Sequence, residues 1–155
     1  MDIGTTIIGA VIVLLCALPL IIMHNNKKKR EQQMIKDLYN FAKTKSCKIT
    51  EHDTWLNTAI GIDKQNKALF FLKGKENNRN LTMVDLTDAR SVNKLPLDTL
   101  DRPQHIEKLE LAIFPQSKEK PATLLEFYNA NVSMQLTDEL ILIRKWDRIV
   151  SSIIA

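Results

Sequence analysis

Few residues in this 155-residue chain have the type and spacing that metal binding or catalysis needs. Its three histidines, His24, His52 and His105, lie far apart in the sequence. His52 and Asp53, in the stretch Glu51–Asp53, could offer metal ligands, but neighbouring residues of a strand point to opposite faces of a sheet. No second His or Cys pair stands at ligand spacing. We therefore predict no metal and no cofactor, and a solvated turn before a strand at this position.

Nucleophilic or acid–base catalysis finds equally little support. Cys47 lacks a local nucleophile motif and is predicted to be a small, half-buried core residue. The chain has four glycines and no glycine-rich phosphate loop. Four carboxylates are scattered over a predicted loop region, where they suit turns and solubility: Asp85, Asp88, Asp98 and Asp101. No catalytic residue is predicted, and a small enzyme using the His52 region is the third alternative for function. His105 is predicted to be an ordinary surface residue.

Residues 3–23 form an apolar run without a single charge. As a helix rising ~1.5 Å per residue, this run spans ~31 Å, close to the ~30 Å hydrocarbon core of a bilayer. A secretory signal would carry positive charge before the apolar run, but the only charged residue there is Asp2. Such a signal would also end in small residues at a cleavage site, whereas this run ends in Pro19–Met23. The run therefore predicts a retained transmembrane helix in contact with the bilayer, with His24 at the membrane edge.

The positive charge of the chain is concentrated just after that run. Residues 27–48 hold eight Lys and Arg against two acidic residues, a net charge of +6, whereas residues 49–155 carry −1. A nucleic-acid-binding domain carries its excess charge on its folded surface, so no nucleic-acid partner is predicted. Because Lys and Arg stay on the cytoplasmic side of a membrane helix, the pattern predicts an outward N-terminus and a cytoplasmic C-terminal domain.

The first four basic residues, Lys27, Lys28, Lys29 and Arg30, form a cluster at the predicted membrane interface. Topology determination is the simplest role for this cluster. Attraction of anionic lipid headgroups is the alternative, and it would make the chain a lipid-sensing module.

Residues 24–46 are predicted to form a basic juxtamembrane helix. Apolar residues recur in it at helical spacing: Met34, Ile35, Leu38, Phe41 and Ala42. This stripe could lie on the bilayer, pair with a second copy to form a homo-oligomer, or pack on the following domain, and we expect the last. Cys16 and Cys47 lie on either side of the basic cluster and cannot meet, which fits a reducing compartment.

Residues 47–155 are predicted to form an antiparallel sheet structure with a C-terminal helix. Period-two patterns and turn residues predict strands over Thr54–Asp63, Lys67–Gly74, Leu81–Leu86, Ala89–Leu95, His105–Phe114 and Ala122–Ala130. The polar residues 64–66 between the first two predict a hairpin. Thr137 is the expected N-cap of the final helix, and Asp138 and Glu139 suit its dipole. The predicted domain core consists of Trp55, Ile60, Ile62, Leu69, Phe71, Leu111, Ile113, Phe127, Leu142 and Trp146.

Three parts of residues 47–155 resemble the pleckstrin-homology-like barrel: Gly61–Lys73, Val84–Val92 and the terminal helix with Trp146. The chain also looks like small single-pass bacterial membrane proteins with a cytoplasmic domain of this type, a resemblance that implies location in the inner membrane of a bacterium. The resemblance implies an α+β fold that binds phosphoinositides, peptides or partner proteins. The resemblance implies that phosphoinositide-binding members have a basic first hairpin with an Arg on its second strand. In this chain the corresponding stretch, Gly61–Lys73, has lysines but no Arg. We therefore expect a membrane-anchored cytoplasmic module that binds or assembles other membrane-associated proteins.

Overall fold

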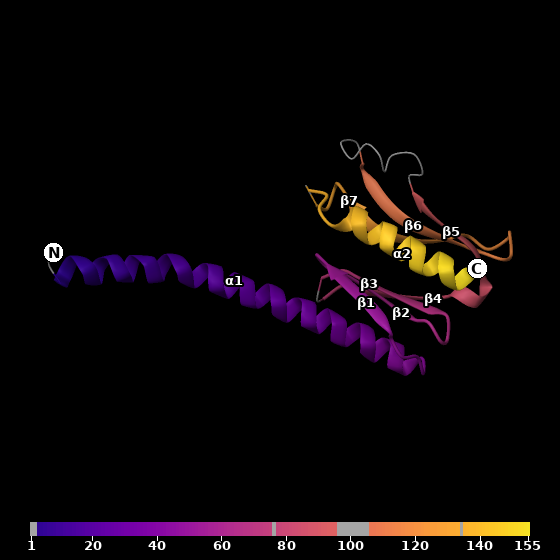
Figure 1. The fold of residues 1–155 in the computed structure, drawn as a ribbon, viewed down its shortest axis with the longest axis horizontal. Coiled ribbons are helices and arrows are strands. Elements are labelled where there is room, and N and C mark those ends of the chain that lie inside the picture. Colours follow the sequence, from indigo (N-terminus) through magenta and orange to yellow (C-terminus); the bar gives the residue numbers. More distant parts are fainter. Residues whose placement is uncertain (1–2, 76, 96–105, 134) are drawn as a thin grey trace. The chain divides into compact units, whose positions relative to one another are not determined.

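The chain folds as an α+β protein in the computed structural model, which describes residues 3–75, 77–95, 106–133 and 135–155. The elements in chain order are α1 (Ile3–Thr44), β1 (Glu51–Trp55), β2 (Thr58–Asp63), β3 (Ala68–Lys73), β4 (Asn80–Asp85), η1 (Leu86–Asp88), β5 (Ala89–Leu95), β6 (Lys108–Pro115), β7 (Thr123–Asn129) and α2 (Glu139–Ile154) (Figure 1). The predicted α+β class and the C-terminal helix are confirmed. The predictions for Asp98, Asp101 and His105 concern residues outside the described ranges.

The chain divides into two compact units, one ending at Gln33 and the other running from Met34 to Ala155. The first unit is the N-terminal part of α1, and its large apolar side chains between Ile3 and Met23 are exposed. Among the described residues, α1 is the one helix that is long and apolar enough to cross a membrane. The expectation of a long apolar N-terminal helix is therefore confirmed.

The last three turns of α1 belong to the second unit and pack on the first sheet. Met34, Leu38 and Ala42, spaced four residues apart, are all buried. They share a core with small and aromatic residues of β2 and β3 and with the segment before β1: Ile49, Ala59, Ala68, Phe70 and Leu72. A Cβ atom at Gly61 would lie 3.0 Å from Leu38 Cδ2, so the absence of a side chain lets the helix approach β2 closely. Of the three arrangements considered for this stripe, the structure shows packing on the domain.

Seven antiparallel strands form two sheets, with the orders β1-β2-β3-β4 and β5-β6-β7. The predicted hairpin around residues 64–66 is present as β2 and β3. The expected strand Thr54–Asp63 is wrong as a single element, because a two-residue turn at Leu56 and Asn57 divides it. Leu56 occupies the left-handed region with φ +48°, which bulky residues seldom adopt and the sequence therefore did not indicate.

The larger core lies between the two sheets and α2. Nine of the ten predicted core residues are buried there; Leu142 is half-buried, and the adjacent Ile143 is buried in its place. Trp55 stacks on Phe127 with ring centroids 4.7 Å apart, and its indole N–H donates to the Phe127 carbonyl at 3.0 Å. That carbonyl lies where the register of β6 and β7 shifts, so the tryptophan satisfies a group that the ladder leaves free.

The start of α2 differs from the expected capping pattern. Asp138 occupies the N-cap position and its side chain makes no capping hydrogen bond. Thr137 donates instead, through its backbone N–H and its hydroxyl, to Glu139 Oε2 at 2.7 and 3.2 Å. The carboxylate of Glu139 therefore orders the chain before the helix, and the prediction of Thr137 as N-cap is wrong.

The turn between β2 and β3 is organised by the buried carboxylate of Asp63. Its Oδ1 accepts the backbone N–H groups of Gln65 and Asn66 at 2.9 and 3.0 Å. Its Oδ2 accepts the Lys48 backbone N–H and the Asn66 side-chain amide, both at 2.7 Å. Burial alone would raise the pKa of Asp63, but these four hydrogen bonds lower it below its ordinary value.

Replacing Leu38 tests whether the end of α1 is part of the domain core. Leu38 is fully buried, so we expect Leu38→Ala to lower the free energy of unfolding by about 2–5 kcal/mol. Denaturation of the full chain in lipid nanodiscs measures this loss. Asn40→Ala, on the exposed side of the same helix, is the control and should change stability by less than about 0.5 kcal/mol. Equal stability of both variants would contradict docking.

The Asp63 carboxylate predicts a loss of stability in acid. Its pKa is lower in the folded chain than the ordinary 3.8, so the ionised group stabilises the fold above that pH. This contribution disappears as the pH falls through the folded-state pKa. Asp63→Asn should cost about 1–3 kcal/mol at neutral pH and flatten this acid dependence, which denaturant titrations from pH 7 to pH 3 measure. The exposed substitution Glu107→Gln should leave the profile unchanged.

Candidate functional site

The residues with catalytic potential do not come together in the structure. Tyr39 Oη lies 3.0 Å from His52 Nδ1, and His24 is exposed in the first unit. His52 and Asp53 belong to β1 and are half-buried, so the expectation of a solvated turn is wrong. They do point to opposite faces, since His52 contacts α1 and Asp53 contacts α2. The described residues contain no group of three or more His, Cys, Asp or Glu that could hold a metal ion.

Cys47 is half-buried, and its surroundings lower the reactivity of its thiol. Burial, and after it the charge of Asp63, raises the pKa of the Cys47 thiol. Its Sγ lies 3.4 Å from the Lys45 carbonyl. The reactive form of a cysteine is the thiolate, so these surroundings make Cys47 a poor nucleophile at neutral pH.

A charged cluster joins α2 to β1. Asp53 Oδ2 accepts the indole N–H of Trp146 at 2.8 Å and the ammonium of Lys145 at 2.7 Å. The hydrogen bond that Lys145 donates to Asp53 raises the pKa of Lys145, and the hydrogen bond that Lys64 donates to Glu51 lowers the pKa of Glu51. Both shifts move the pKa of the group further from neutral pH, whereas a general acid or base needs a pKa near the working pH. The cluster therefore holds α2 in place.

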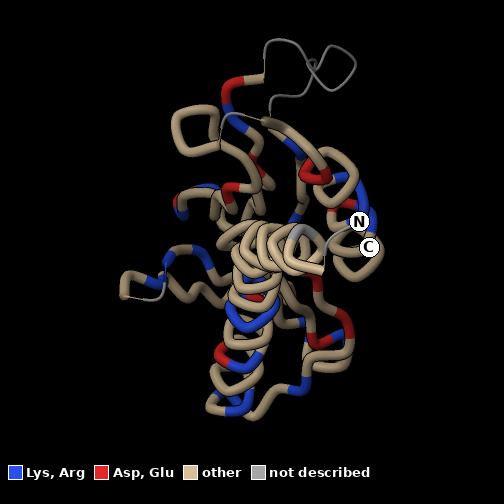
Figure 2. The backbone as a smooth tube through the Cα atoms, turned by 90° about the vertical axis from the view of Figure 1, so that its left-hand side faces the viewer, with Lys and Arg blue, Asp and Glu red and all other residues tan. Residues whose placement is uncertain are grey.

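The basic cluster Lys27, Lys28, Lys29 and Arg30 is exposed on α1. Figure 2 shows Lys and Arg on several turns of this helix, where Glu31 and Asp37 are the acidic residues among them. None of the four forms an ion pair with a described residue. These charges are free to meet an external anionic group.

Strand β4 is an open edge of the first sheet. The Leu86 N–H donates to the Lys67 carbonyl at 2.8 Å, and this bond sets the phase of the β3–β4 ladder. Because hydrogen-bonded and non-hydrogen-bonded pairs alternate in an antiparallel ladder, the N–H and C=O groups of Leu81 and Met83 point away from β3. No described strand pairs with β4 on that side. We call these outward groups and the two side chains the β4 edge.

The β4 edge lacks the usual protection against pairing with another chain. Its strand, Asn80–Asp85, contains no Pro, Lys or Arg, has its one charged residue, Asp85, at the last position, and has a regular register with β3. The Leu81 and Met83 side chains are 36% and 38% exposed. They lie opposite Leu72 and Phe70 and so share the face that α1 covers. An apolar strand added here would continue both the ladder and that face.

A groove of about 210 Å³ adjoins the last residues of β4. It is lined by Met83, Val84, Asp85, Asp88, Ala89, Ile113, Pro115, Lys120, Pro121 and Thr123. Lys120 and Asp88 form an ion pair at 2.9 Å, and this contact raises the pKa of Lys120. The groove offers room for one side chain beside the β4 edge, and it is smaller than the about 300–1,000 Å³ that cofactors and drug-sized ligands need.

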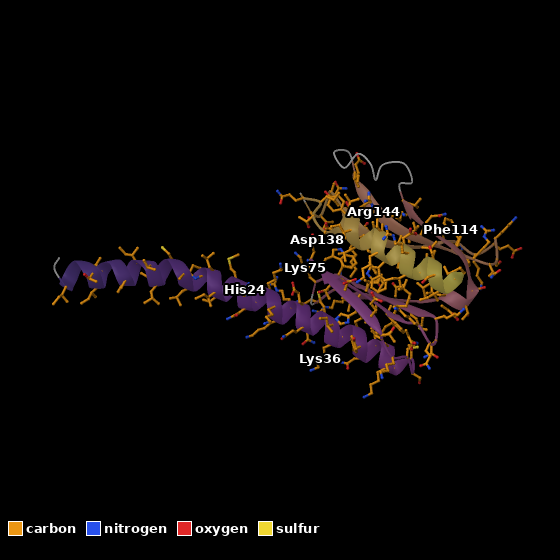
Figure 3. All side chains as sticks on the ribbon, in the orientation of Figure 1. His24, Lys36, Lys75, Phe114, Asp138 and Arg144 are labelled. Atoms are coloured by element: carbon orange, nitrogen blue, oxygen red, sulfur yellow. The ribbon has the colours of Figure 1, made fainter. Side chains whose placement is uncertain are left out.

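A second recess of about 140 Å³ lies at one end of the domain, where the β1–β2 turn meets the end of β7. Its walls are Leu56, Asn57, Thr58, Lys73, Phe127, Tyr128, Asn129, Val132 and Ser133. A recess of this size holds one apolar group. In Figure 3, Lys75 and Asp138 mark the same end of the domain and Phe114 marks the opposite end.

Comparison with known proteins gives no relative for the chain: no family model, no curated protein and no solved structure matches it significantly. The candidate surfaces therefore rest on this structure alone. Sequence reasoning missed both the β4 edge and the recess at the domain end. Leu81 and Met83 lie in the predicted strand Leu81–Leu86, but whether that strand is central or at an edge is decided by how distant segments pair.

Proposed function

We propose that the chain is a membrane-anchored protein-binding module that adds an extended segment of a partner protein to its β4 edge. The observation that carries this proposal is the unpaired, unprotected edge with two exposed apolar side chains. Addition of a strand to a sheet edge gives affinity through main-chain hydrogen bonds and specificity through alternate side chains. The adjoining groove supplies a place for one of those side chains.

In this proposal residues 3–23 span the inner membrane of a bacterium, with the N-terminus outside and the domain in the cytoplasm. The apolar helix and the exposed basic cluster that follows it support this topology. Anchoring confines the domain to the membrane surface and raises its effective concentration for membrane-associated partners. Two antiparallel sheets of four and three strands followed by a helix support a pleckstrin-homology-like arrangement, a fold class that includes peptide-binding members.

Proline at position 83 tests strand addition directly. The N–H of Met83 points outward, so Met83→Pro removes a donor for an incoming strand and keeps the ladder to β3. A photoreactive residue at the exposed position 80 would report contact with a partner in native membranes. We expect Met83→Pro to lower that crosslink about tenfold, because main-chain hydrogen bonds are worth about 1 kcal/mol each and the ring obstructs the partner backbone.

Two further variants make this result interpretable. Met83→Ala shortens the side chain but keeps the N–H, so it should crosslink more strongly than the proline variant. Thr82→Pro removes an N–H that points toward Phe71, so it should weaken the sheet itself. This variant is the control that shows how unfolding of the domain changes the crosslink. Strand addition at β4 is excluded if Met83→Pro and the unchanged chain crosslink equally. A crosslink to a second copy would identify the partner as the chain itself.

Lipid sensing by the basic cluster is the second candidate function, favoured by the exposure of Lys27, Lys28, Lys29 and Arg30. Each such charge near an anionic surface contributes about 1 kcal/mol of attraction. The lipid that co-purifies with the full chain in mild detergent should then be enriched in anionic species, as measured by mass spectrometry. Replacing the four residues with Gln, or raising the salt to about 0.5 M, should remove the enrichment. Bulk lipid composition around the unchanged chain would exclude this function.

A further inference from the structure

We propose that the domain docks on the bilayer through an apolar tip formed by Leu56, Val132 and Ile141. This inference rests on the membrane anchoring proposed above and is independent of strand addition at β4. The occupant of the surface is the lipid interface itself, which the chain already reaches through residues 3–23.

The three residues of the apolar tip are the most exposed large apolar side chains described in the second unit. Val132 is 76% exposed, Ile141 70% and Leu56 58%. Burial of such groups is the main driving force available to a surface of this kind, whether in protein or in lipid. Scattered single residues of this type need no explanation, but a group of three at one place does.

The fold gathers these three residues at one end of the domain. Leu56, on the β1–β2 turn, and Val132, after β7, line the same recess. Ile141 lies in the first turn of α2, whose later part contacts η1 at the far end of β4. Figures 1 and 3 show the start of α2, marked by Asp138, beside the end of β7. Residues from three separate segments thus lie at this end of the domain, and two of them, Leu56 and Val132, line the recess.

Leu56 is held in a backbone conformation that is unfavourable for leucine, and its side chain adds nothing to either hydrophobic core. A leucine at φ +48° is strained relative to glycine or asparagine, which occupy this region readily. The side chain is exposed and belongs to neither hydrophobic core. Strained residues of this kind cluster at functional sites, so the conformation supports a functional role for Leu56.

The chain arrives in the domain at the same end. Asp37, one turn into the second unit, pairs with Arg79, just before β4 begins. The other end of the docked segment, at Ala42, is linked through Cys47 to the Asp63 turn at the opposite end of β2. Only ten residues, 24–33, separate the apolar run from Met34, and even fully extended they reach at most about 40 Å. The connection therefore keeps Met34, at this end of the domain, within about 40 Å of the end of the apolar run.

The one charged residue in the wall of the recess is already paired, so we expect docking to depend on apolar contact. Lys73, in the wall of the recess, forms an ion pair with Glu126. Its ammonium is thus committed within the domain. Bilayer contact by the tip should be insensitive to salt, which distinguishes it from attraction of anionic lipid by the basic cluster.

Nitroxide labels on the full chain in lipid vesicles test the proposal. Single cysteines at positions 132 and 141, with Cys16 and Cys47 replaced by Ser, carry the label. Collision with oxygen, which concentrates in lipid, is compared with collision with a water-soluble nickel chelate. We expect the oxygen-to-nickel ratio at both positions to exceed several-fold the ratio at position 124. Leu124 is the matched control, because it is 50% exposed and lies at the start of β7, away from the tip.

A label at position 14 separates the two proposals. If that position is not in lipid, membrane anchoring itself fails. If position 14 is in lipid but positions 132 and 141 resemble position 124, the tip proposal fails and anchoring stands. Shielding of positions 132 and 141 from both reagents would mean that a protein covers the tip, which also overturns the proposal.

The substitution Leu56→Gly provides a check that unfolding cannot imitate. It relieves the positive φ, so the thermal stability of the chain should stay the same or rise. It also removes one inserted side chain, so the docked population should fall about tenfold, as expected for losing the burial of one leucine. In the unchanged chain, we expect the oxygen-to-nickel ratio at positions 132 and 141 to be the same at 50 and 500 mM salt. A docked population unaffected by Leu56→Gly, or abolished by salt, would contradict the proposal.

Discussion

The rest of the structure depends on burying both faces of the two central strands, β2 and β3. Every residue of β2 is buried, and so is every residue of β3 except Lys73. A sheet with two apolar faces needs a cover on each side. The second sheet and α2 cover one face, and the last turns of α1 cover the other. The helix that begins as an apolar segment therefore ends as part of the domain core.

The same constraint explains which parts of the fold could be predicted from the sequence. Strand β6 turns Leu109, Leu111 and Ile113 to the larger core, and this alternation along the sequence marked it correctly as a strand. The second core around Phe70 and Leu72 was not identified, because burial on both faces removes that alternation. The division of β1 from β2 was also missed, since the turn uses a leucine at positive φ where glycine or asparagine is usual.

The candidate surfaces could not be predicted for a different reason: each is created by pairing over long sequence distances. Leu81 and Met83 are accessible because β5 begins a new sheet after η1 and does not extend the first one. Leu56, Val132 and Ile141 are unremarkable in the sequence and become a group only when β1, β7 and α2 meet. The basic cluster, by contrast, was visible from charge alone, because its meaning depends on sequence position beside the apolar run.

The β4 edge and the apolar tip occupy different parts of the domain and do not compete. β4 begins near the tip, just after Arg79, and runs to η1 at the far end. A strand paired with β4 would therefore lie along the side of the domain while the tip contacts lipid. Docking at one end would also limit rotation of the domain about its connection to the apolar part of α1. A restricted domain presents its edge in fewer orientations, which lowers the entropic cost of capturing a membrane-associated partner.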